Sequence, residues 1–177
     1  SLNLRVQARN KAKHSNALLK SEYFSNLDPR SIAKIIDEMD YKAIQQNQYE
    51  RCRQGEQAHI FYILVSGSCQ VTIGGKAVAV LGELDVFGES ALFTDGNDLS
   101  IRGATVTTIN GEGEHVQLLA LPREKFNKLL ASGTLNEDCI SKLKKVAEKR
   151  KRENKNAERL PLPPQAKLEE VGMVAVD

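Results

Sequence analysis

The sequence has no tryptophan, few aromatic residues (5%) and only three cysteines among its 177 residues. Cys52, Cys69 and Cys139 are far apart and form no Cys-x-x-Cys pair, so a zinc site or a disulfide framework is not expected. Such cysteine usage favours a reducing, cytoplasmic location. No apolar run approaches the roughly 20 residues of a membrane helix, and residues 1–20 lack the apolar stretch of a signal peptide. We therefore expect no membrane partner.

Catalytic and metal-binding patterns are also missing. The three histidines, His14, His59 and His115, are scattered and include no His-x-His pair, whereas a catalytic metal needs clustered ligands. None of the cysteines lies beside a candidate base. We therefore assign no catalytic residue and no metal ligand, and expect this chain not to be an enzyme by itself.

The composition is typical of a globular protein, with 41% hydrophobic and 27% charged residues. The net charge of +2 conceals a basic segment, residues 142–159, which carries nine Lys or Arg and three Glu. No aromatic side chain interleaves these charges to stack on bases. The segment therefore favours a solvated helix face, and a nucleic-acid partner is not expected.

The hydrophobic period changes twice along the chain. Residues 1–39 have helical spacing, with Asp28 and Pro29 as a start signal for the second helix. Residues 122–159 return to helical spacing, and Asn136 is placed to cap the longer helix there. Prolines then predict an extended linker and tail over residues 160–177.

The middle zone, residues 40–121, consists of short apolar runs between glycine-containing turns, and Gly74-Gly75 is a hairpin signal. Many short strands predict an α+β fold, an antiparallel β-roll of the jelly-roll or cupin-like barrel type with helices at both ends. The expected strands are 61–65, 69–73, 77–81, 104–109 and 116–121.

One segment, residues 82–106, carries recognition chemistry. Gly88 allows a close approach of the backbone to a ligand, and the N–H groups of the short turn that follows can bind an anion. The Glu89 carboxylate can accept a hydrogen bond from a sugar hydroxyl, and the Arg102 guanidinium suits phosphate. These groups describe a nucleotide-phosphate pocket. The alternative is that Glu89 and Arg102 simply pair with each other.

The residues around these groups distinguish the two readings. Phe-Gly-Glu-Ser-Ala-Leu at 87–92 and Arg-Gly-Ala-Thr-Val at 102–106 resemble the phosphate-binding cassette of cyclic nucleotide-binding domains. Residues 53–56, 61–67 and 78–82 are similar to the strands that precede this cassette. The resemblance extends over about residues 20–150, including the flanking helices.

This resemblance implies roles for individual residues. Glu89 would bind the ribose 2′-hydroxyl, and Arg102 would bind the exocyclic oxygens of the cyclic phosphate. The helix after the β-roll would cap the base, with Leu143 and Val146 as candidates. Backbone groups lining the phosphate and ribose would come from Gly88, Ser90, Ala91 and Ala104.

Two departures from the family pattern concern affinity and selectivity. The spacer at residues 93–101 is about four residues longer than in kinase-type members, a bulge that costs little stability but can loosen the arginine. Gly103 stands where many cGMP-selective members have a Thr or Ser hydroxyl for guanine. The expected ligand is cAMP or cGMP, with Gly103 favouring cAMP or poor discrimination.

Residues 126–130 and the long helix from Asn136 resemble the tail of the last nucleotide-binding domain of cyclic-nucleotide-dependent protein kinases. Residues 167–174 resemble the first kinase strand, although no glycine-rich loop is present. The implied partner is a kinase catalytic domain, in cis or in trans, controlled allosterically by this chain. Two alternatives stay open. One is a degenerate module that binds another ligand or only a protein. The other is a DNA-binding regulator of the catabolite-activator type.

Overall fold

A computed structural model of the chain describes residues 2–45, 50–93, 101–111 and 114–158. Helices α1 (Leu2–Lys20) and α2 (Pro29–Asp37) precede the strands, and α3 (Arg123–Ala131) and α4 (Glu137–Glu158) follow them. The predicted α+β class, a β-roll with helices at both ends, is confirmed. The expected linker and tail at 160–177 lie outside the described residues.

The described strands form two antiparallel four-stranded sheets, in the orders β1-β8-β3-β6 and β2-β7-β4-β5. All five expected strands are present within a residue or two of their predicted ends. The bounds are β1 Asp40–Ile44, β2 Glu50–Cys52, β3 Ile60–Ser66, β4 Ser68–Ile73, β5 Lys76–Leu81, β6 Val86–Phe87, β7 Thr105–Ile109 and β8 Val116–Pro122. The Gly74-Gly75 hairpin joins β4 to β5 with positive φ at both glycines.

Strand β3 is apolar throughout because both of its faces are buried. Phe61 and Ile63 join the core between the first sheet and the helices. Tyr62 and Leu64 join the second core, between the two sheets. Strand β8 alternates in the same way, with Leu119 facing the helical core. A continuous apolar run is the expected pattern for a strand covered on both sides.

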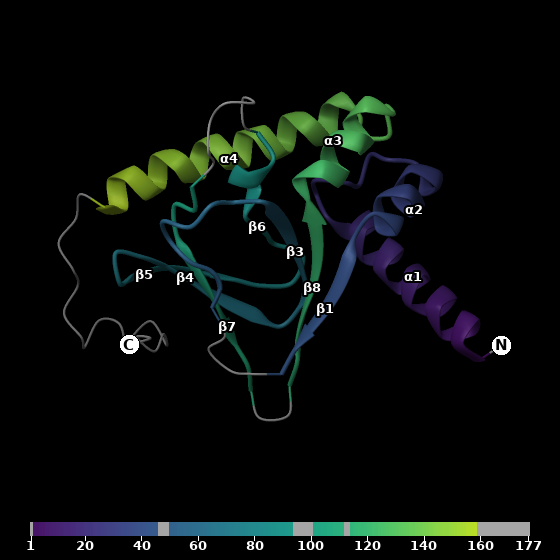
Figure 1. Cartoon of the computed structure of the whole chain (residues 1–177), viewed down its shortest axis with the longest axis horizontal. Coiled ribbons are helices and arrows are strands. Elements are labelled where there is room, and N and C mark those ends of the chain that lie inside the picture. Colours follow the sequence, from purple (N-terminus) through teal and green to yellow (C-terminus); the bar gives the residue numbers. More distant parts are fainter. Residues whose placement is uncertain (1, 46–49, 94–100, 112–113, 159–177) are drawn as a thin grey trace.

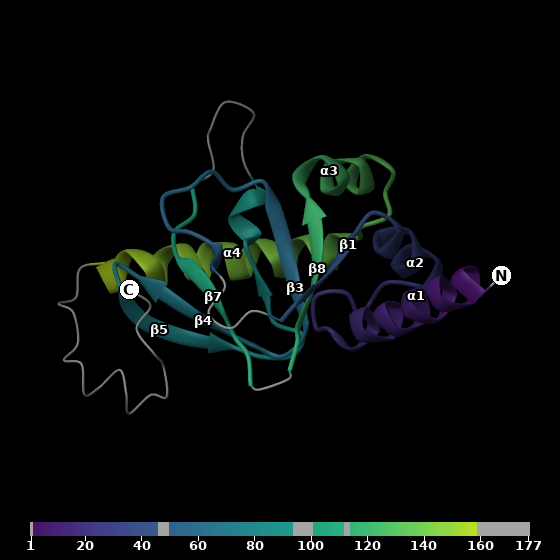
Figure 2. The same cartoon turned by 60° about the horizontal axis from the view of Figure 1, so that its bottom comes forward.

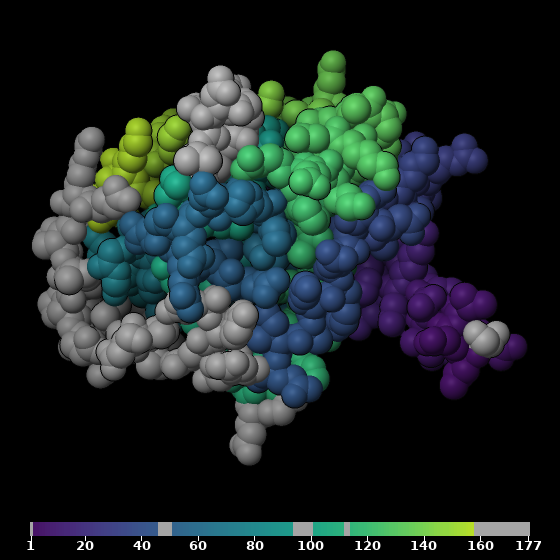
Figure 3. Space-filling view, viewed as in Figure 1, coloured from purple at the N-terminus to yellow at the C-terminus, as the bar shows by residue number. Residues whose placement is uncertain are grey.

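The helices cover one side of the roll and extend from it. In Figure 1, α4 runs along the top of the β-roll, while α1 lies at the opposite end from the tip of α4. Figure 2 shows the same long α4 spanning the width of the roll from behind. Most of α1 is exposed, with Leu18 and His14 as its buried side chains, and Figure 3 shows it projecting from the body.

Both predicted helix caps are present. The Asp28 carboxylate accepts a hydrogen bond from the Ser31 backbone N–H at 2.7 Å, with Pro29 at the first helical position. The Asn136 side chain accepts one from the Cys139 N–H at 2.9 Å. These bonds satisfy N–H groups that have no partner inside their helices. The caps therefore fix where α2 and α4 begin.

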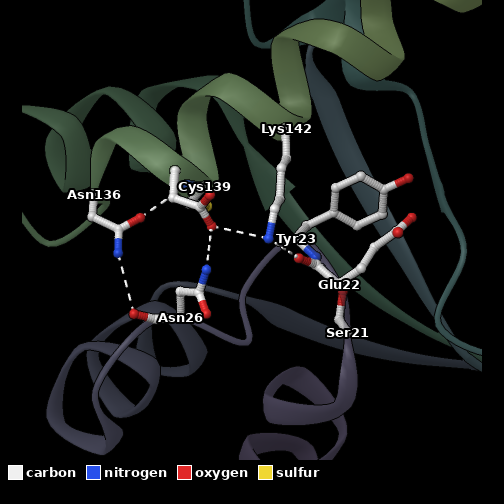
Figure 4. A network of polar contacts seen from close by, with 8 residues as sticks. Ser21, Glu22, Tyr23, Asn26, Asn136, Cys139 and Lys142 are labelled. Carbon is white, nitrogen blue, oxygen red and sulfur yellow. Dashed lines mark hydrogen bonds and ion pairs between the residues drawn. The ribbon is translucent and has the colours of Figure 1, made fainter.

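A polar network joins the start of α4 to the loop between α1 and α2 (Figure 4). Asp138 accepts hydrogen bonds from Asn26 at 2.8 Å and pairs with Lys142 at 3.0 Å. The Lys142 ammonium also donates to the Glu22 carbonyl at 2.9 Å. Burial of Leu18, Phe24, Cys139 and Leu143 in one core places apolar packing beside this network. The two helical segments are thus joined across more than 100 residues of sequence.

Three short strands were not expected. Strand β1 is exposed along most of its length and pairs with β8 through the backbone, so its sequence lacks an apolar alternation. Strands β2 and β6 have three and two residues. The three cysteines are buried free thiols. Among the described residues, no helix is long and apolar enough to cross a bilayer.

His14 gives the fold a predicted pH dependence. Burial lowers the pKa of its imidazole, and the neighbouring Lys13 lowers it further, while the ring stacks on Tyr41 with centroids 4.8 Å apart. The unfolded chain then binds a proton more readily than the folded one below about pH 6.5. We expect the free energy of unfolding to fall as the pH drops below that value, and to fall less in His14→Gln.

Urea unfolding at about pH 7.5 and about pH 5.5 measures this difference. The exposed His59 offers a matched control, because His59→Gln removes an imidazole without changing a buried one. An equal pH dependence in His14→Gln and the unchanged chain would contradict the assignment.

Candidate functional site

The site is built on a glycine that no other residue can replace without movement. Gly88 lies between β6 and the short 3-10 helix η1 (Glu89–Ala91), in the left-handed region with φ of +74°. A Cβ added there would lie 2.5 Å from Arg102 Nη1 and 2.8 Å from the Ile60 carbonyl oxygen. The turn therefore needs glycine both for its backbone conformation and for the space that Arg102 occupies.

Arg102 is buried beside this turn, with 7% of its surface exposed. Its Nη2 donates a hydrogen bond to the Ile60 carbonyl at 2.7 Å. Its backbone N–H and C=O are bonded to Glu56 and Gly55, which fixes the residue against the turn before β3. Its Nη1 is buried and has no hydrogen-bond partner among the described residues. A buried guanidinium with an unused donor is energetically costly unless an acceptor arrives.

Glu89 is equally buried, but its partner is not Arg102. The Glu89 Oε2 pairs with Arg150 Nη1 of α4 at 2.9 Å, and the same nitrogen donates to the Val86 carbonyl at 2.5 Å. The ion pair that the sequence alternative placed between Glu89 and Arg102 is therefore formed with Arg150. The structure places Gly88 against Arg102, and Glu89 is the next residue of the same turn.

The remaining predicted residues lie around the same turn. Ala91 is fully buried, and its N–H donates to the Gly88 carbonyl at 3.0 Å within η1. The Ala91 carbonyl accepts a hydrogen bond from Arg123 Nε at 2.6 Å, which fastens η1 to the start of α3. Ser90 and Ala104 are partly buried. A Cβ on Gly103 would lie 2.8 Å from Asn154 Nδ2, so Gly103 makes room for a side chain of α4.

Helix α4 contributes residues that the sequence analysis did not single out. Its inward stripe begins with Cys139 and Leu143 in the helical core and continues with Arg150 and Asn154 over the cassette. The Lys76 ammonium donates to the Ala157 carbonyl at 2.5 Å, near the end of α4. The two candidate caps are placed elsewhere: Leu143 is 1% exposed in the helical core, and Val146 packs against that core.

The sequence contains only a weak indication that these α4 residues face the cassette. Arg150 and Asn154 follow Cys139, Leu143 and Val146 at helical spacing, so they share the buried stripe. The basic composition of residues 142–159 suggested solvent instead. Two hollows of about 430 and 350 Å³ lie along α4, lined by charged and polar side chains with Ile140. Their described lining includes no described residue of the cassette.

In the described part of the chain, no group of three His, Cys, Asp or Glu side chains is placed so that it could hold a metal ion. Burial raises the pKa of the Cys52 thiol to about 11 and that of Cys69 to about 12, with the Arg102 guanidinium opposing the shift at Cys52. Both thiols stay protonated at neutral pH, and a protonated thiol is a poor nucleophile. The feature of the site that suits it to binding an anion is the buried Arg102 nitrogen without a hydrogen-bond partner among the described residues.

Comparison with known proteins agrees with this chemistry. Residues 51–132 match the family model described as the cyclic nucleotide-binding domain. The cGMP-dependent protein kinase egl-4 of Caenorhabditis briggsae is 35% identical over 70% of this chain and 16% of its own length. The cAMP-dependent protein kinase regulatory subunit of Debaryomyces hansenii is 30% identical over 74% of this chain and 27% of its length.

A solved structure extends the likeness to three dimensions. The regulatory domain of Toxoplasma gondii PKA, crystallised with cAMP, matches with a TM-score of 0.59 and 29% identity, covering 75% of this chain and 47% of that one. Residues 51–132 are thus a cyclic nucleotide-binding domain, similar to those of kinase regulatory regions. The chain spans about a sixth to a quarter of the two kinase relatives, whose activities belong to the whole proteins.

The need for glycine at position 88 predicts the effect of a single methyl group. Gly88→Ala should lower the free energy of unfolding by about 2–4 kcal/mol, from the left-handed backbone and the collision with Arg102 together. Gly133 is a matched control, because its φ is +73° and a Cβ there meets nothing within 4 Å. Gly133→Ala should cost only about 1–2 kcal/mol. Denaturant unfolding of both variants makes the comparison, and equal losses would show that Arg102 does not crowd Gly88.

Proposed function

We propose that this chain binds cAMP or cGMP at the turn formed by Gly88, Glu89 and Arg102, and that binding regulates a kinase catalytic domain. The observation that carries the proposal is the buried Arg102 Nη1, which lacks a hydrogen-bond partner among the described residues and lies against Gly88. An exocyclic phosphate oxygen would supply the missing acceptor. Charge-assisted bonds of this kind are the strongest available to a binding site.

The charge of the site supports a singly charged ligand. The Glu89 carboxylate is already neutralised by Arg150 at 2.9 Å, whereas no carboxylate among the described residues pairs with the Arg102 guanidinium beside the turn. A cyclic phosphodiester carries one negative charge, whereas a terminal phosphate carries nearly two at neutral pH. Buried charges are stable when they are matched one to one. We expect a cyclic nucleotide to bind more tightly than the corresponding 5′-monophosphate.

The family roles are carried to this chain as parts of the proposal. Glu89 would accept a hydrogen bond from the ribose 2′-hydroxyl, and Arg102 would bind the exocyclic oxygens. Backbone groups of Gly88, Ser90, Ala91, Gly103 and Ala104 would line the phosphate and ribose. The cassette would then extend over residues 87–106, of which the spacer at 94–100 lies outside the described residues.

Regulation would pass through α4. This helix contacts the cassette through Arg150 and the helical core through Leu143. Its position therefore depends on both the site and the other helices. A ligand that favours one arrangement of α4 shifts the population of the whole helical layer. We propose a kinase catalytic domain as the recipient, in cis or in trans, in the cytoplasm.

A second candidate is a degenerate module that binds another ligand or only a protein. The observation in its favour is that α4 side chains already lie over the cassette, with Arg150 on Glu89 and Asn154 beside Gly103. A DNA-binding regulator of the catabolite-activator type is the third alternative. Salt-dependent duplex binding would identify it.

Removing the Arg102 guanidinium tests the main proposal. Arg102→Ala should weaken cyclic nucleotide binding by about 2–5 kcal/mol, the usual cost of truncating one partner of a buried charged pair. Arg152→Ala removes the same charge from an exposed position of α4 and should leave the affinity within about 0.5 kcal/mol. Calorimetric titration with cAMP, cGMP and 5′-AMP measures all three chains.

A thermal shift gives an independent readout. Ligand at about 100 times its dissociation constant should stabilise the fold by about 2.7 kcal/mol. No shift with either cyclic nucleotide would refute the proposed ligand and favour the degenerate module.

Gly103 predicts the choice of nucleotide. A threonine there would supply the hydroxyl that is associated with guanine recognition, so Gly103→Thr should raise the affinity for cGMP relative to cAMP by about tenfold. The new side chain would meet Asn154 Nδ2, which is the flexible end of a side chain. Gly103→Thr with Asn154→Ala gives it full room, and Asn154→Ala alone is the control. An unchanged cGMP-to-cAMP ratio in both threonine variants would contradict a role for position 103.

A further inference from the structure

A β-bulge in β2 turns the side chain of Arg51 toward the inside of the roll. In the pairing of β2 with β7, Glu50 lies opposite Thr107, and Cys52 lies opposite the adjacent Val106. Arg51 is therefore an extra residue between two positions of the ladder. Regular alternation would point Arg51 and Cys52 to opposite faces of the sheet. The bulge removes this alternation, and bulges commonly re-aim a side chain beside a binding site.

The Arg51 guanidinium lies over an aromatic stack that leads to the cassette. Its central carbon is 5.1 Å from the centroid of the Tyr62 ring. The Tyr62 ring is stacked on that of Phe87, with the centroids 4.9 Å apart. Phe87 directly precedes Gly88, where an added Cβ would lie 2.5 Å from Arg102 Nη1. A series of contacts between neighbouring residues thus connects Arg51 with Arg102.

The two arginines act on the same buried groups. Burial raises the pKa of the Cys52 thiol to about 11, and the charges of Arg102 and Arg51 both act against that rise. Burial also raises the pKa of Tyr62, and the same two charges oppose this second rise. A charge shifts the pKa of another group strongly only when the two lie close together. Arg51 and Arg102 therefore share one region of the interior, which is the core between the two sheets.

Each of these arginines keeps a buried donor without a hydrogen-bond partner among the described residues. The donors are Nε of Arg51 and Nη1 of Arg102. The neighbouring carboxylate of Glu89 is paired with Arg150 at 2.9 Å instead. Two like charges in one interior region repel each other, and a buried donor without an acceptor costs free energy. An anion bound between the two guanidinium groups would relieve both costs.

We propose that Arg51 is a second phosphate-binding residue of this site, and that its Nε donates to one exocyclic oxygen of a cyclic nucleotide while Arg102 donates to the other. The inference rests on the proposed function. Bonds between a guanidinium and a phosphate oxygen are short and strong because both partners are charged. Arg51 is partly exposed and lies on an aromatic face, so part of its charge is already compensated. A singly charged phosphate therefore suffices for both arginines.

Replacing Arg51 with methionine tests the assignment. Arg51→Met keeps an apolar stem that can pack on Tyr62, and it removes the charge and the donors. It should weaken cAMP binding by about 10- to 100-fold, the value of a hydrogen bond to a charged group. Arg53→Met is the matched control, because the Arg53 side chain is 64% exposed. The control should keep the affinity within about twofold of the unchanged chain, as measured by calorimetric titration.

Two phosphorothioate analogues of cAMP distinguish the oxygens. Each diastereomer replaces one exocyclic oxygen with sulfur, which is a weaker hydrogen-bond acceptor, and keeps the negative charge. The unchanged chain should bind both diastereomers more weakly than cAMP. In Arg51→Met, the penalty for one diastereomer should fall to less than about twofold, while the penalty for the other persists. Arg102→Met should give the reverse pattern.

The contrary result is an equal loss of affinity for cAMP and for both phosphorothioates in Arg51→Met. That outcome would show that Arg51 acts only by packing on Tyr62, and it would overturn the proposal. Thermal unfolding without ligand shows whether Arg51→Met is folded. If it is not, Arg51→Lys takes its place, because lysine keeps the charge and lacks Nε. The same loss of discrimination against one diastereomer is expected there, and its absence would overturn the proposal.

The same titrations separate this inference from the proposed function. If the unchanged chain binds neither cAMP nor cGMP, the proposed function fails and this inference fails with it. If the unchanged chain binds cAMP, and Arg102→Ala weakens the binding while Arg51→Met does not, the inference alone fails.

Discussion

Burial of one sheet on both faces is the constraint on which the other parts depend. Strands β3 and β8 pack the helices on one side and the second sheet on the other, so each contributes alternate residues to two cores. Ile60, the first residue of β3, also supplies the carbonyl that accepts a hydrogen bond from the Arg102 guanidinium. Because a close-packed sheet has little room to shift, the proposed regulation would have to act through elements that can move as units, above all α4.

The cassette contains Arg102 and the carboxylate of Glu89, and α4 adds Arg150. The two arginines differ in whether their guanidinium nitrogens have partners. Arg150 is matched by Glu89 and reaches the site from a distant helix. Arg102 is part of the roll itself and keeps a buried nitrogen without a partner among the described residues. In the proposed function, the unpartnered Arg102 nitrogen is the group that would receive the anionic phosphate.

The sequence predicted the parts of the fold whose side chains carry a pattern. The apolar runs of β3 and β8 and the caps at Asp28 and Asn136 were readable because each depends on residues close in the chain. Strand β1 was not readable, since backbone pairing with β8 holds it and its side chains are exposed. Gly88, Glu89 and Arg102 were found through a local motif, whereas Arg150 meets Glu89 across 61 residues from a segment with the composition of a solvated surface.

The network between Asn26, Asp138 and Lys142 has a consequence for biosynthesis. During synthesis α1 and α2 leave the ribosome before their partners at the start of α4, which follow more than 100 residues later. At about 5–20 residues per second, the interval amounts to several seconds. During that time the apolar side chains of Leu18 and Phe24 have no complete core to enter, because Cys139 and Leu143 of the same core have not yet been made.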